Sequence, residues 1–111
     1  MNDCVFCNIV NKTLQKEILF EDDQVVVFKD ILPKAPVHML IVSKDHIPSI
    51  NHLGVGREGL IGAMVYAAKK VAEKYGIGES GYKLVFNVGR DGGQVIPHLH
   101  LHLLGGKQLG E

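Results

Sequence analysis

Hydrophobic and polar positions alternate most regularly near the end of the chain, in the run PHLHLHLL at positions 97–104. On a strand, successive side chains point to opposite faces, so the three histidines share one face and the leucines share the other. The same spacing on a helix would scatter the imidazoles around the cylinder. The pattern therefore predicts a strand over 97–104 with a polar face and an apolar back.

Four other apolar runs predict strands over 18–21, 25–29, 37–42 and 81–88. The pair Asp22-Asp23 lies between the first two and predicts a hairpin turn. Residues 30–36 predict a rigid loop, because each of its two prolines fixes its own φ and restricts the preceding residue. We expect a connector with a short helical turn over 43–51 and a turn over 89–94.

The longest periodic segment predicts a helix over 56–75. Its apolar positions recur at helical spacing, and they are Leu60, Met64, Ala67, Ala68, Val71 and Tyr75. Gly76 and Gly78 offer a left-handed stop after it, and residues 4–12 predict a short helix. We expect the long helix to cover the leucine back of the sheet. The order of elements predicts an α+β fold with a five-stranded antiparallel sheet.

Composition narrows the function classes. With 111 residues the chain predicts a single domain over 1–111, and its 12 basic and 12 acidic residues cancel. A binder of long nucleic acid would show a basic surplus, and no apolar stretch reaches the length of a membrane span. The first residues lack the pattern of a signal peptide, so we expect a cytoplasmic protein. Cys4 and Cys7 have a spacing that suits a metal site or a redox pair.

The histidine strand allows three interpretations. A neutral imidazole can attack phosphorus and form a covalent intermediate, while neighbouring imidazoles protonate the leaving group and hold phosphate oxygens. A His-x-His pair can also bind a metal. The third interpretation is a polar strand without a special role, which the clustering of three histidines beside a Gly-Gly turn disfavours.

Two nearby segments could complete a nucleotide pocket. The turn Asp91-Gly92-Gly93-Gln94 allows close approach of a ligand, and its free N–H groups could cradle phosphate. Asn87 could point into the same site. Asp30 could accept the hydroxyls of a ribose while Ile31 packs on a base, although Asp30 is also a common loop-capping residue.

Two segments resemble the histidine-triad (HIT) family, and most closely its nucleotide-binding branch, the HINT proteins. They are FKDILPKAPVH at 28–38 and DGGQVIPHLHLHLLGG at 91–106. The resemblance is collinear over nearly the whole chain. It implies a five-stranded antiparallel sheet with helices, and a homodimer with one continuous larger sheet. It also implies hydrolysis of purine nucleoside phosphoramidates or related nucleotidyl esters to a nucleoside monophosphate.

The resemblance also assigns roles. It makes His100 the nucleophile that becomes adenylylated, His102 the residue that contacts phosphate and assists the leaving group, and His38 a member of the same cluster. It places Asp30 on the ribose and Ile31 on the purine. The phosphate side of the pocket is assigned to Asn87, Gly93, Gln94 and Val95. Many family members carry a Ser where this chain has Val95, so proton delivery falls to histidine or water.

Zinc is the one cofactor that the resemblance suggests, and no organic cofactor is expected. In some family members two N-terminal cysteines combine with a connector histidine and the first triad histidine. The matching positions are Cys4, Cys7, His46 and His98. Two sulfurs and two nitrogens suit tetrahedral structural zinc, whereas the simpler interpretation is a pair of buried cysteines.

Two alternative functions remain at this point. A dinucleoside polyphosphate hydrolase would use the same nucleophile, and the size of the pocket beyond the phosphate would separate it from a phosphoramidase. A nucleotide-binding scaffold protein with incidental catalysis is the alternative from another class, which the intact triad disfavours.

Overall fold

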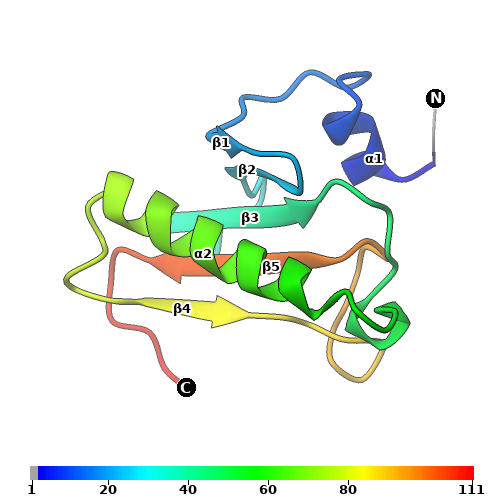
Figure 1. The fold of residues 1–111 in the computed structure, drawn as a ribbon. Coiled ribbons are helices and arrows are strands. Elements are labelled where there is room, and N and C mark those ends of the chain that lie inside the picture. The colour runs from blue at the N-terminus through cyan, green and yellow to red at the C-terminus, as the bar shows by residue number, and fades with distance from the viewer. Residues whose placement is uncertain (1–2) are drawn as a thin grey trace.

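The computed structural model describes residues 3–111, and in that range it contains one five-stranded sheet with two α-helices (Figure 1). The elements in chain order are α1 (Val5–Val10), β1 (Phe20–Glu21), β2 (Val25–Lys29), β3 (Val37–Ser43), the 3-10 turn η1 (Ile50–His52), α2 (Glu58–Lys74), β4 (Tyr82–Val85) and β5 (His100–Gly105). Within the described residues, neither helix combines the length and apolar character needed to cross a bilayer.

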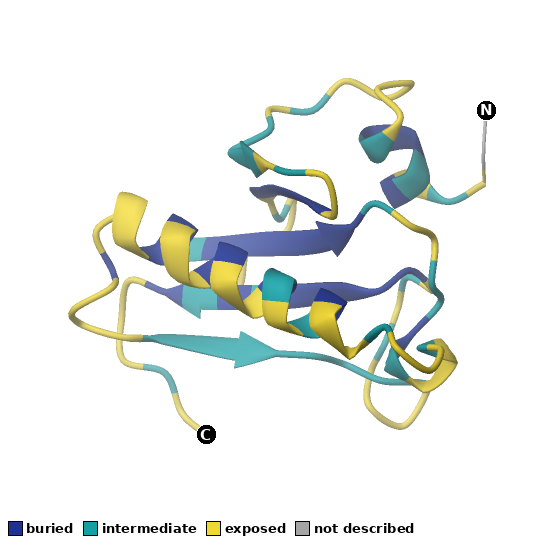
Figure 2. Ribbon diagram, viewed as in Figure 1, coloured by how far each residue is buried: buried dark blue, intermediate teal, exposed yellow. Residues whose placement is uncertain are grey.

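The sheet has the order β1-β2-β3-β5-β4, and every neighbouring pair is antiparallel. This confirms the predicted α+β fold. Strand β5 is inserted between β3 and β4, so the histidine strand lies inside the sheet, beside a strand that is buried at every position except Val37 (Figure 2). The register aligns Leu40 with His102 and Val42 with His100.

One face of the sheet packs under α2 and forms the larger core. The odd-numbered side chains of β2, β3 and β5 point to this face, as the alternation of a pleated strand requires. They meet the apolar stripe of α2, which consists of Leu60, Met64, Ala67, Ala68, Val71 and Ala72. The predicted packing of the helix on the leucine back is therefore confirmed.

The opposite face carries the histidines and also a second apolar cluster. Phe6 and Ile9 of α1 cover Val26, Phe28, Leu40 and Val42 there. The alternating pattern predicts a polar face on β5, but the neighbouring positions on β2 and β3 on this side of the sheet are mostly apolar. Because a six-residue helix is marginal on its own, α1 depends on this packing for its place.

The C-terminal end of α2 follows a local signal. The helix stops at Lys74, where Gly76 takes a φ of +78° and Ile77 donates its N–H back to the carbonyl of Ala72.

The hairpin between β1 and β2 is closed by Asp22, whose Oδ1 accepts the N–H groups of Gln24 and Val25 at 2.8 and 2.9 Å. Both features agree with the predicted stop and turn.

Three predicted strands are too long, and the one predicted over 18–21 spans only Phe20–Glu21. The strand predicted over 81–88 spans Tyr82–Val85, and the strand predicted from residue 97 begins only at His100. Pro97 has no N–H, and the next two N–H groups donate to Ile96 O and Ile47 O instead of a neighbouring strand. His98 consequently lies in a bend before β5, tied to the connector that follows β3.

Candidate active site

Three histidines lie together on the α1 face of the sheet. The ring centroids of His100 and His102, both on β5, are 5.0 Å apart. His38 comes from β3, and its centroid lies 5.2 Å from that of His102. Because Leu40 is directly opposite His102, His38 lies diagonally across from the same ring. Alternation along two neighbouring strands thus gathers three of the predicted residues.

The proton position on His100 is fixed by the backbone. Its Nδ1 lies 2.6 Å from the carbonyl oxygen of His98, and a carbonyl only accepts, so Nδ1 carries the hydrogen. The lone pair of the neutral ring is therefore on Nε2. Burial lowers the pKa of His100, while the bond to His98 opposes that shift. The ring is neutral near pH 7, in the state that a nucleophile requires.

A single backbone amide sets the protons on the other two rings. The N–H of Lys34 donates to Nδ1 of His38 at 3.0 Å, so the hydrogen of neutral His38 is on Nε2. That Nε2 lies 2.9 Å from Nδ1 of His102. His102 accepts there and carries its own hydrogen on Nε2.

The ring of His102 is held neutral more strongly than the other two. Burial, followed by repulsion from His100 and His38, lowers the pKa of His102 to about 4. Desolvation also lowers the pKa of His38. The free protein therefore presents neutral imidazoles at pH 7, with one lone pair on His100 and one N–H on His102.

Asp30 lies beside this group because β2 ends next to the start of β3. Its Oδ2 is 3.3 Å from Nε2 of His38, and its Oδ1 accepts the N–H of Leu32 at 2.8 Å. The following Ile31 and Leu32 are 81% and 76% exposed. The carboxylate of Asp30 can accept hydrogen bonds from the hydroxyls of a sugar. The two exposed apolar side chains beside it can cover the attached base.

The glycine-rich turn borders the other side of the histidines. Asn87 follows β4, and extending the β4–β5 register places it level with His100. Its Nδ2 donates to the carbonyl of Gly92 at 2.8 Å, which closes the turn. A Cβ at Gly92 would lie 2.3 Å from Val88 O, and Gly93 has a φ of +79°, so both positions require glycine.

Gln94 braces this turn with its side chain. Its Oε1 accepts the N–H of Gly89 at 2.9 Å, and its Nε2 donates to Pro48 O and Ile96 O at 2.7 and 3.0 Å. The carboxamide is thus engaged within the protein. Val95 beside it is 88% exposed.

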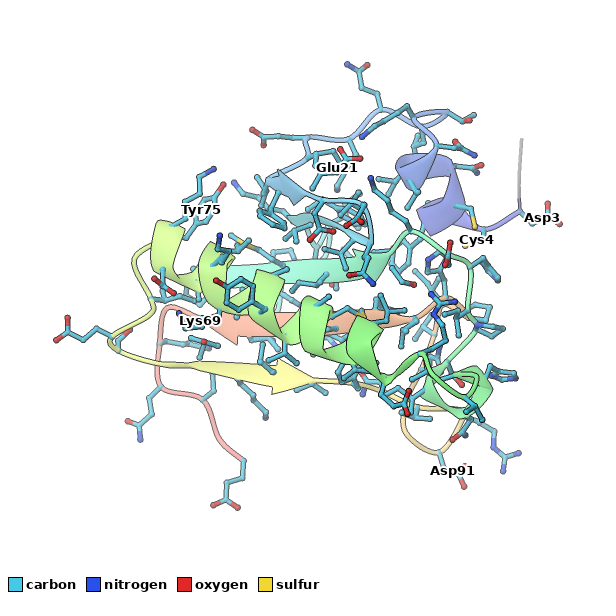
Figure 3. All side chains as sticks on the ribbon, viewed as in Figure 1. Asp3, Cys4, Glu21, Lys69, Tyr75 and Asp91 are labelled. Atoms are coloured by element: carbon cyan, nitrogen blue, oxygen red, sulfur yellow. The ribbon has the colours of Figure 1, made fainter. Side chains whose placement is uncertain are left out.

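Two cysteines and two histidines form a second group next to the first. The possible ligand atoms of Cys4, Cys7, His46 and His98 all lie within 4.8 Å of one another. Nδ1 of His98 is 3.3 Å from Sγ of Cys4, 3.6 Å from Sγ of Cys7 and 3.1 Å from Nδ1 of His46. Cys4 and the turn containing Asp91 lie at the same end of the sheet (Figure 3).

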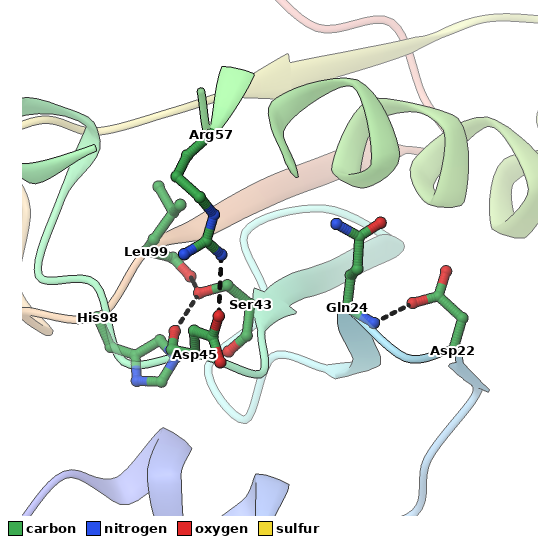
Figure 4. Close-up of polar contacts among 7 residues, drawn as sticks. All are labelled: Asp22, Gln24, Ser43, Asp45, Arg57, His98 and Leu99. Carbon is green, nitrogen blue, oxygen red and sulfur yellow. Dashed lines mark hydrogen bonds and ion pairs between the residues drawn. The ribbon is translucent and has the colours of Figure 1, made fainter. Parts of the chain in front are cut away.

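The orientation of His98 fits a metal ligand. Its Nε2 donates to the carbonyl of Ser43 at 2.7 Å, and both residues are drawn in Figure 4. The lone pair is therefore on Nδ1, which faces the thiols of Cys4 and Cys7. Ser43 is itself held by its Oγ, which donates to Asp45 O at 2.8 Å. In metal sites the nitrogen of a histidine ligand that does not bind the metal usually donates such a hydrogen bond, here from His98 Nε2 to Ser43 O. The four residues could hold a metal ion.

A third set of possible ligands is less suitable for a metal. Asp30, His38 and His102 also bring their ligand atoms within 4.8 Å of one another. Nε2 of His38 could ligate only if its hydrogen moved to Nδ1. The N–H of Lys34 already points at Nδ1, and two hydrogens would collide there. This geometry favours a hydrogen-bonded pair of imidazoles over a metal centre.

Comparison with known proteins identifies this arrangement. Residues 3–110 match the family model described as "Scavenger mRNA decapping enzyme C-term binding". A HIT family hydrolase from Legionella pneumophila is 44% identical, covers 97% of this chain and 96% of its own, and has a TM-score of 0.93. The chain belongs to the histidine-triad family.

Other histidine-triad relatives agree. A histidine triad protein from Clostridium difficile has a TM-score of 0.96 at 35% identity, with 100% of this chain and 96% of that chain covered. The purine nucleoside phosphoramidase of Escherichia coli K12 is 42% identical over 108 residues, which are 97% of this chain and 91% of the relative.

Sequence reasoning missed two participants in this histidine-triad site. Phe6 packs edge-on against the rings of His98 and His100, with centroids 5.8 and 5.1 Å away. Its place between the two cysteines was the available signal. The role of the Lys34 backbone N–H could not be found from the sequence, because every non-proline residue has a backbone N–H. His52 is exposed and bonds only within its turn, to Ser49 at 2.9 Å.

Proposed function

We propose that this chain hydrolyses purine nucleoside 5′-phosphoramidates and related AMP derivatives through a covalent His100-AMP intermediate. The observation that carries the proposal is the proton arrangement of the cluster. His100 has its lone pair on Nε2, and the neighbouring ring of His102 carries its hydrogen on Nε2. The relative from Escherichia coli named purine nucleoside phosphoramidase supports the substrate class.

In the first step Nε2 of His100 attacks the α-phosphorus, and the bond from phosphorus to the amine nitrogen breaks. The amine must take up a proton to leave. A phosphate anion favours the cationic form of a neighbouring imidazole, so the bound substrate promotes protonation of His102. His102 takes up this proton from water at Nδ1, and the ring of His38 tilts so that its Nε2–H points at Oδ2 of Asp30, 3.3 Å away, instead of at His102. His102 delivers its Nε2 proton to the amine and becomes neutral again.

In the second step water attacks the same phosphorus, and the bond between phosphorus and His100 breaks. The water gives one proton to His102 as its oxygen joins the phosphate, and AMP leaves. His100 keeps its Nδ1 hydrogen on the carbonyl of His98 throughout, so its lone pair returns to Nε2. When AMP leaves, His102 returns the proton on its Nδ1 to water and accepts the Nε2–H of His38 again. Each histidine then ends where it began, and the net reaction consumes one water.

The rest of the pocket orients the nucleotide. We assign the ribose hydroxyls to Asp30 and the purine to the exposed side chain of Ile31. The phosphate side is formed by Asn87, Gly93, Gln94 and Val95, where Gln94 contributes through the turn that it braces. Val95 has no hydroxyl, so the leaving-group proton comes from His102 or from water.

We further propose that the group Cys4, Cys7, His46 and His98 binds structural zinc. Zinc with bond lengths of roughly 2.0 Å to nitrogen and 2.3 Å to sulfur places neighbouring tetrahedral ligand atoms about 3.3–3.8 Å apart. Four of the six distances among these atoms are 3.1–3.6 Å, close to that spacing, and the other two are at most 4.8 Å. Four protein ligands would close the site, so the metal would act on structure rather than on substrate.

A homodimer and a cytoplasmic location complete the proposal. Strand β4 is one of the two outer strands of the sheet, and Leu84 and Phe86 on or next to it are only partly buried. Pairing of two such edges would extend the sheet and cover apolar side chains. Light scattering at micromolar concentration tests the dimer. Cys4 and Cys7 are not joined in a disulfide, as is usual in a reducing compartment.

A substrate panel tests the function. The panel contains an adenosine phosphoramidate, a diadenosine polyphosphate and a cap dinucleotide, the last because of the family description. We expect AMP release to be fastest from the phosphoramidate and to be lost in His100→Ala. The matched control is His52→Ala, because His52 is exposed and lies outside the cluster. Preference for either dinucleotide would favour another hydrolase, and nucleotide binding without turnover would indicate a binding protein.

A further inference from the structure

Phe6 connects the cysteine-histidine group to the nucleophile. It lies on α1 between Cys4 and Cys7 and is only 3% exposed. Its ring meets the ring of His100 at an interplanar angle of 76° and that of His98 at 79°. Edge-to-face contacts of this kind favour one ring orientation over others. One side chain therefore contacts both the possible metal ligand and the residue that attacks phosphorus.

The place of α1 depends on few contacts. The helix has six residues, too few to be stable alone. It is held by its apolar cluster with the sheet and by the two thiols that face His98 and His46. A metal bound by Cys4 and Cys7 would fasten both ends of the first helical turn. Phe6 lies inside that turn and would be fastened with it.

We propose that Phe6 is a positioning residue for His100, and that occupation of the cysteine-histidine group by a metal tightens this contact. The inference rests on the proposed function of His100. The hydrogen bond from Nδ1 to the carbonyl of His98 holds one edge of the His100 ring. That bond leaves the ring free to tilt about it. The edge of Phe6 restricts the tilt and keeps the lone pair on Nε2 directed at phosphorus.

Two substitutions on the same helix separate positioning from stability. Phe6→Leu removes the ring but keeps apolar volume, whereas Ile9→Ala weakens the same cluster and leaves the ring contacts of Phe6 with His98 and His100 in place. We expect Phe6→Leu to lower kcat about ten-fold with little change in KM, because a slightly misdirected nucleophile reacts more slowly. Ile9→Ala should lower the melting temperature and leave kcat within about two-fold. Equal effects of the two variants on kcat would overturn the proposal.

A readout independent of turnover tests the link to the metal. Zn²⁺ added to metal-free protein should slow hydrogen exchange at the amides of Asn8 and Asn11, which donate to Cys4 O and Cys7 O. It should also shift the ring ¹⁵N signals of His100. In Phe6→Leu the exchange should still slow, but the His100 signals should respond much less. In Cys7→Ser both effects should disappear.

The outcomes distinguish this inference from the proposed function. If His100→Ala is inactive while Phe6→Leu keeps the kcat of the unchanged protein, the function stands and the positioning role is wrong. Zn²⁺ that leaves the His100 signals unmoved in the unchanged protein contradicts the metal link. If His100→Ala retains full activity, the proposed function itself fails.

Discussion

The backbone N–H of Lys34 donates to Nδ1 of His38 at 3.0 Å, and this bond decides where the protons lie in the histidine cluster. It confines the hydrogen of neutral His38 to Nε2 and makes Nδ1 of His102 an acceptor. His102 thereby presents its own N–H on Nε2. The main-chain N–H of Lys34, in the loop before β3, thus determines which nitrogen carries the hydrogen in both His38 and His102.

Replacing Lys34 with proline removes that N–H, whereas Lys34→Ala keeps it and removes only an exposed side chain. We expect Lys34→Pro to lower kcat about ten-fold, because the proton on His38 is no longer fixed and that on His102 no longer follows. Lys34→Ala should stay near the unchanged rate. Ring ¹⁵N spectra should show a mixture of His38 tautomers only in the proline variant. A single Nε2–H tautomer in both variants would refute this role of the amide.

The stability of the protein should fall as the pH drops from about 6.5 toward 4. Burial and the charges of His100 and His38 lower the pKa of His102 from 6.5 to about 4 in the folded state. Between these values the unfolded chain binds more protons than the folded one, so acid favours unfolding. Urea unfolding at several pH values measures the slope, and His102→Asn should flatten it. A stability that rises as the pH falls through this window would contradict the assignment.

Removal of the metal should loosen the N-terminal end of the fold. Chelation should lower the melting temperature of the unchanged protein, because the group Cys4, Cys7, His46 and His98 loses its common partner. The Cys4→Ser variant should have, with or without chelator, the melting temperature that the unchanged protein has in the presence of chelator. Metal analysis of gently purified protein should give zinc in the unchanged chain and much less in the variant. Protein isolated without zinc and indifferent to chelator would exclude the site.

Much of the fold follows from local patterns. The boundaries of β2 were predicted correctly because Asp22-Asp23 and the proline loop bound one apolar run. Those of α2 were predicted to within two residues, since its stripe and Gly76 are sequence-local signals. The start of β5 was predicted wrongly. Whether a strand extends depends on which backbone groups lie beside it, and at 98 and 99 these belong to loops.

The site was predictable where side chains carry its chemistry. The alternation brought His100 and His102 to one face, the loop after β2 offered Asp30, and the resemblance added His38. The structure places Asp30 and His38 beside the other two. The amide of Lys34 could not be predicted, because its importance depends on the fold of the loop. The position of Phe6 between two cysteines marks it as a neighbour of the cysteine-histidine group, but its contact with His100 joins residues that are distant in sequence and was not predictable.

Gly92 offers a test of the turn with an internal comparison. A Cβ there would lie 2.3 Å from the carbonyl oxygen of Val88, so Gly92→Ala should cost more than about 1 kcal/mol of stability and weaken nucleotide binding. A Cβ at Gly59 on α2 would point into open space. Gly59→Ala should therefore raise the stability by up to about 1 kcal/mol. Unfolding curves and AMP titrations measure both effects, and a Gly92→Ala protein as stable as the unchanged one would contradict the close packing.

Rapid-quench mass spectrometry of the protein mixed with an adenosine phosphoramidate tests the central claim most directly. The account predicts a transient increase in mass by one adenylyl group, located by peptide mapping on His100. The adduct should be absent in His100→Ala and present in His52→Ala. An adenylyl group on another residue, or phosphoramidate hydrolysis that continues in His100→Ala, would contradict the account.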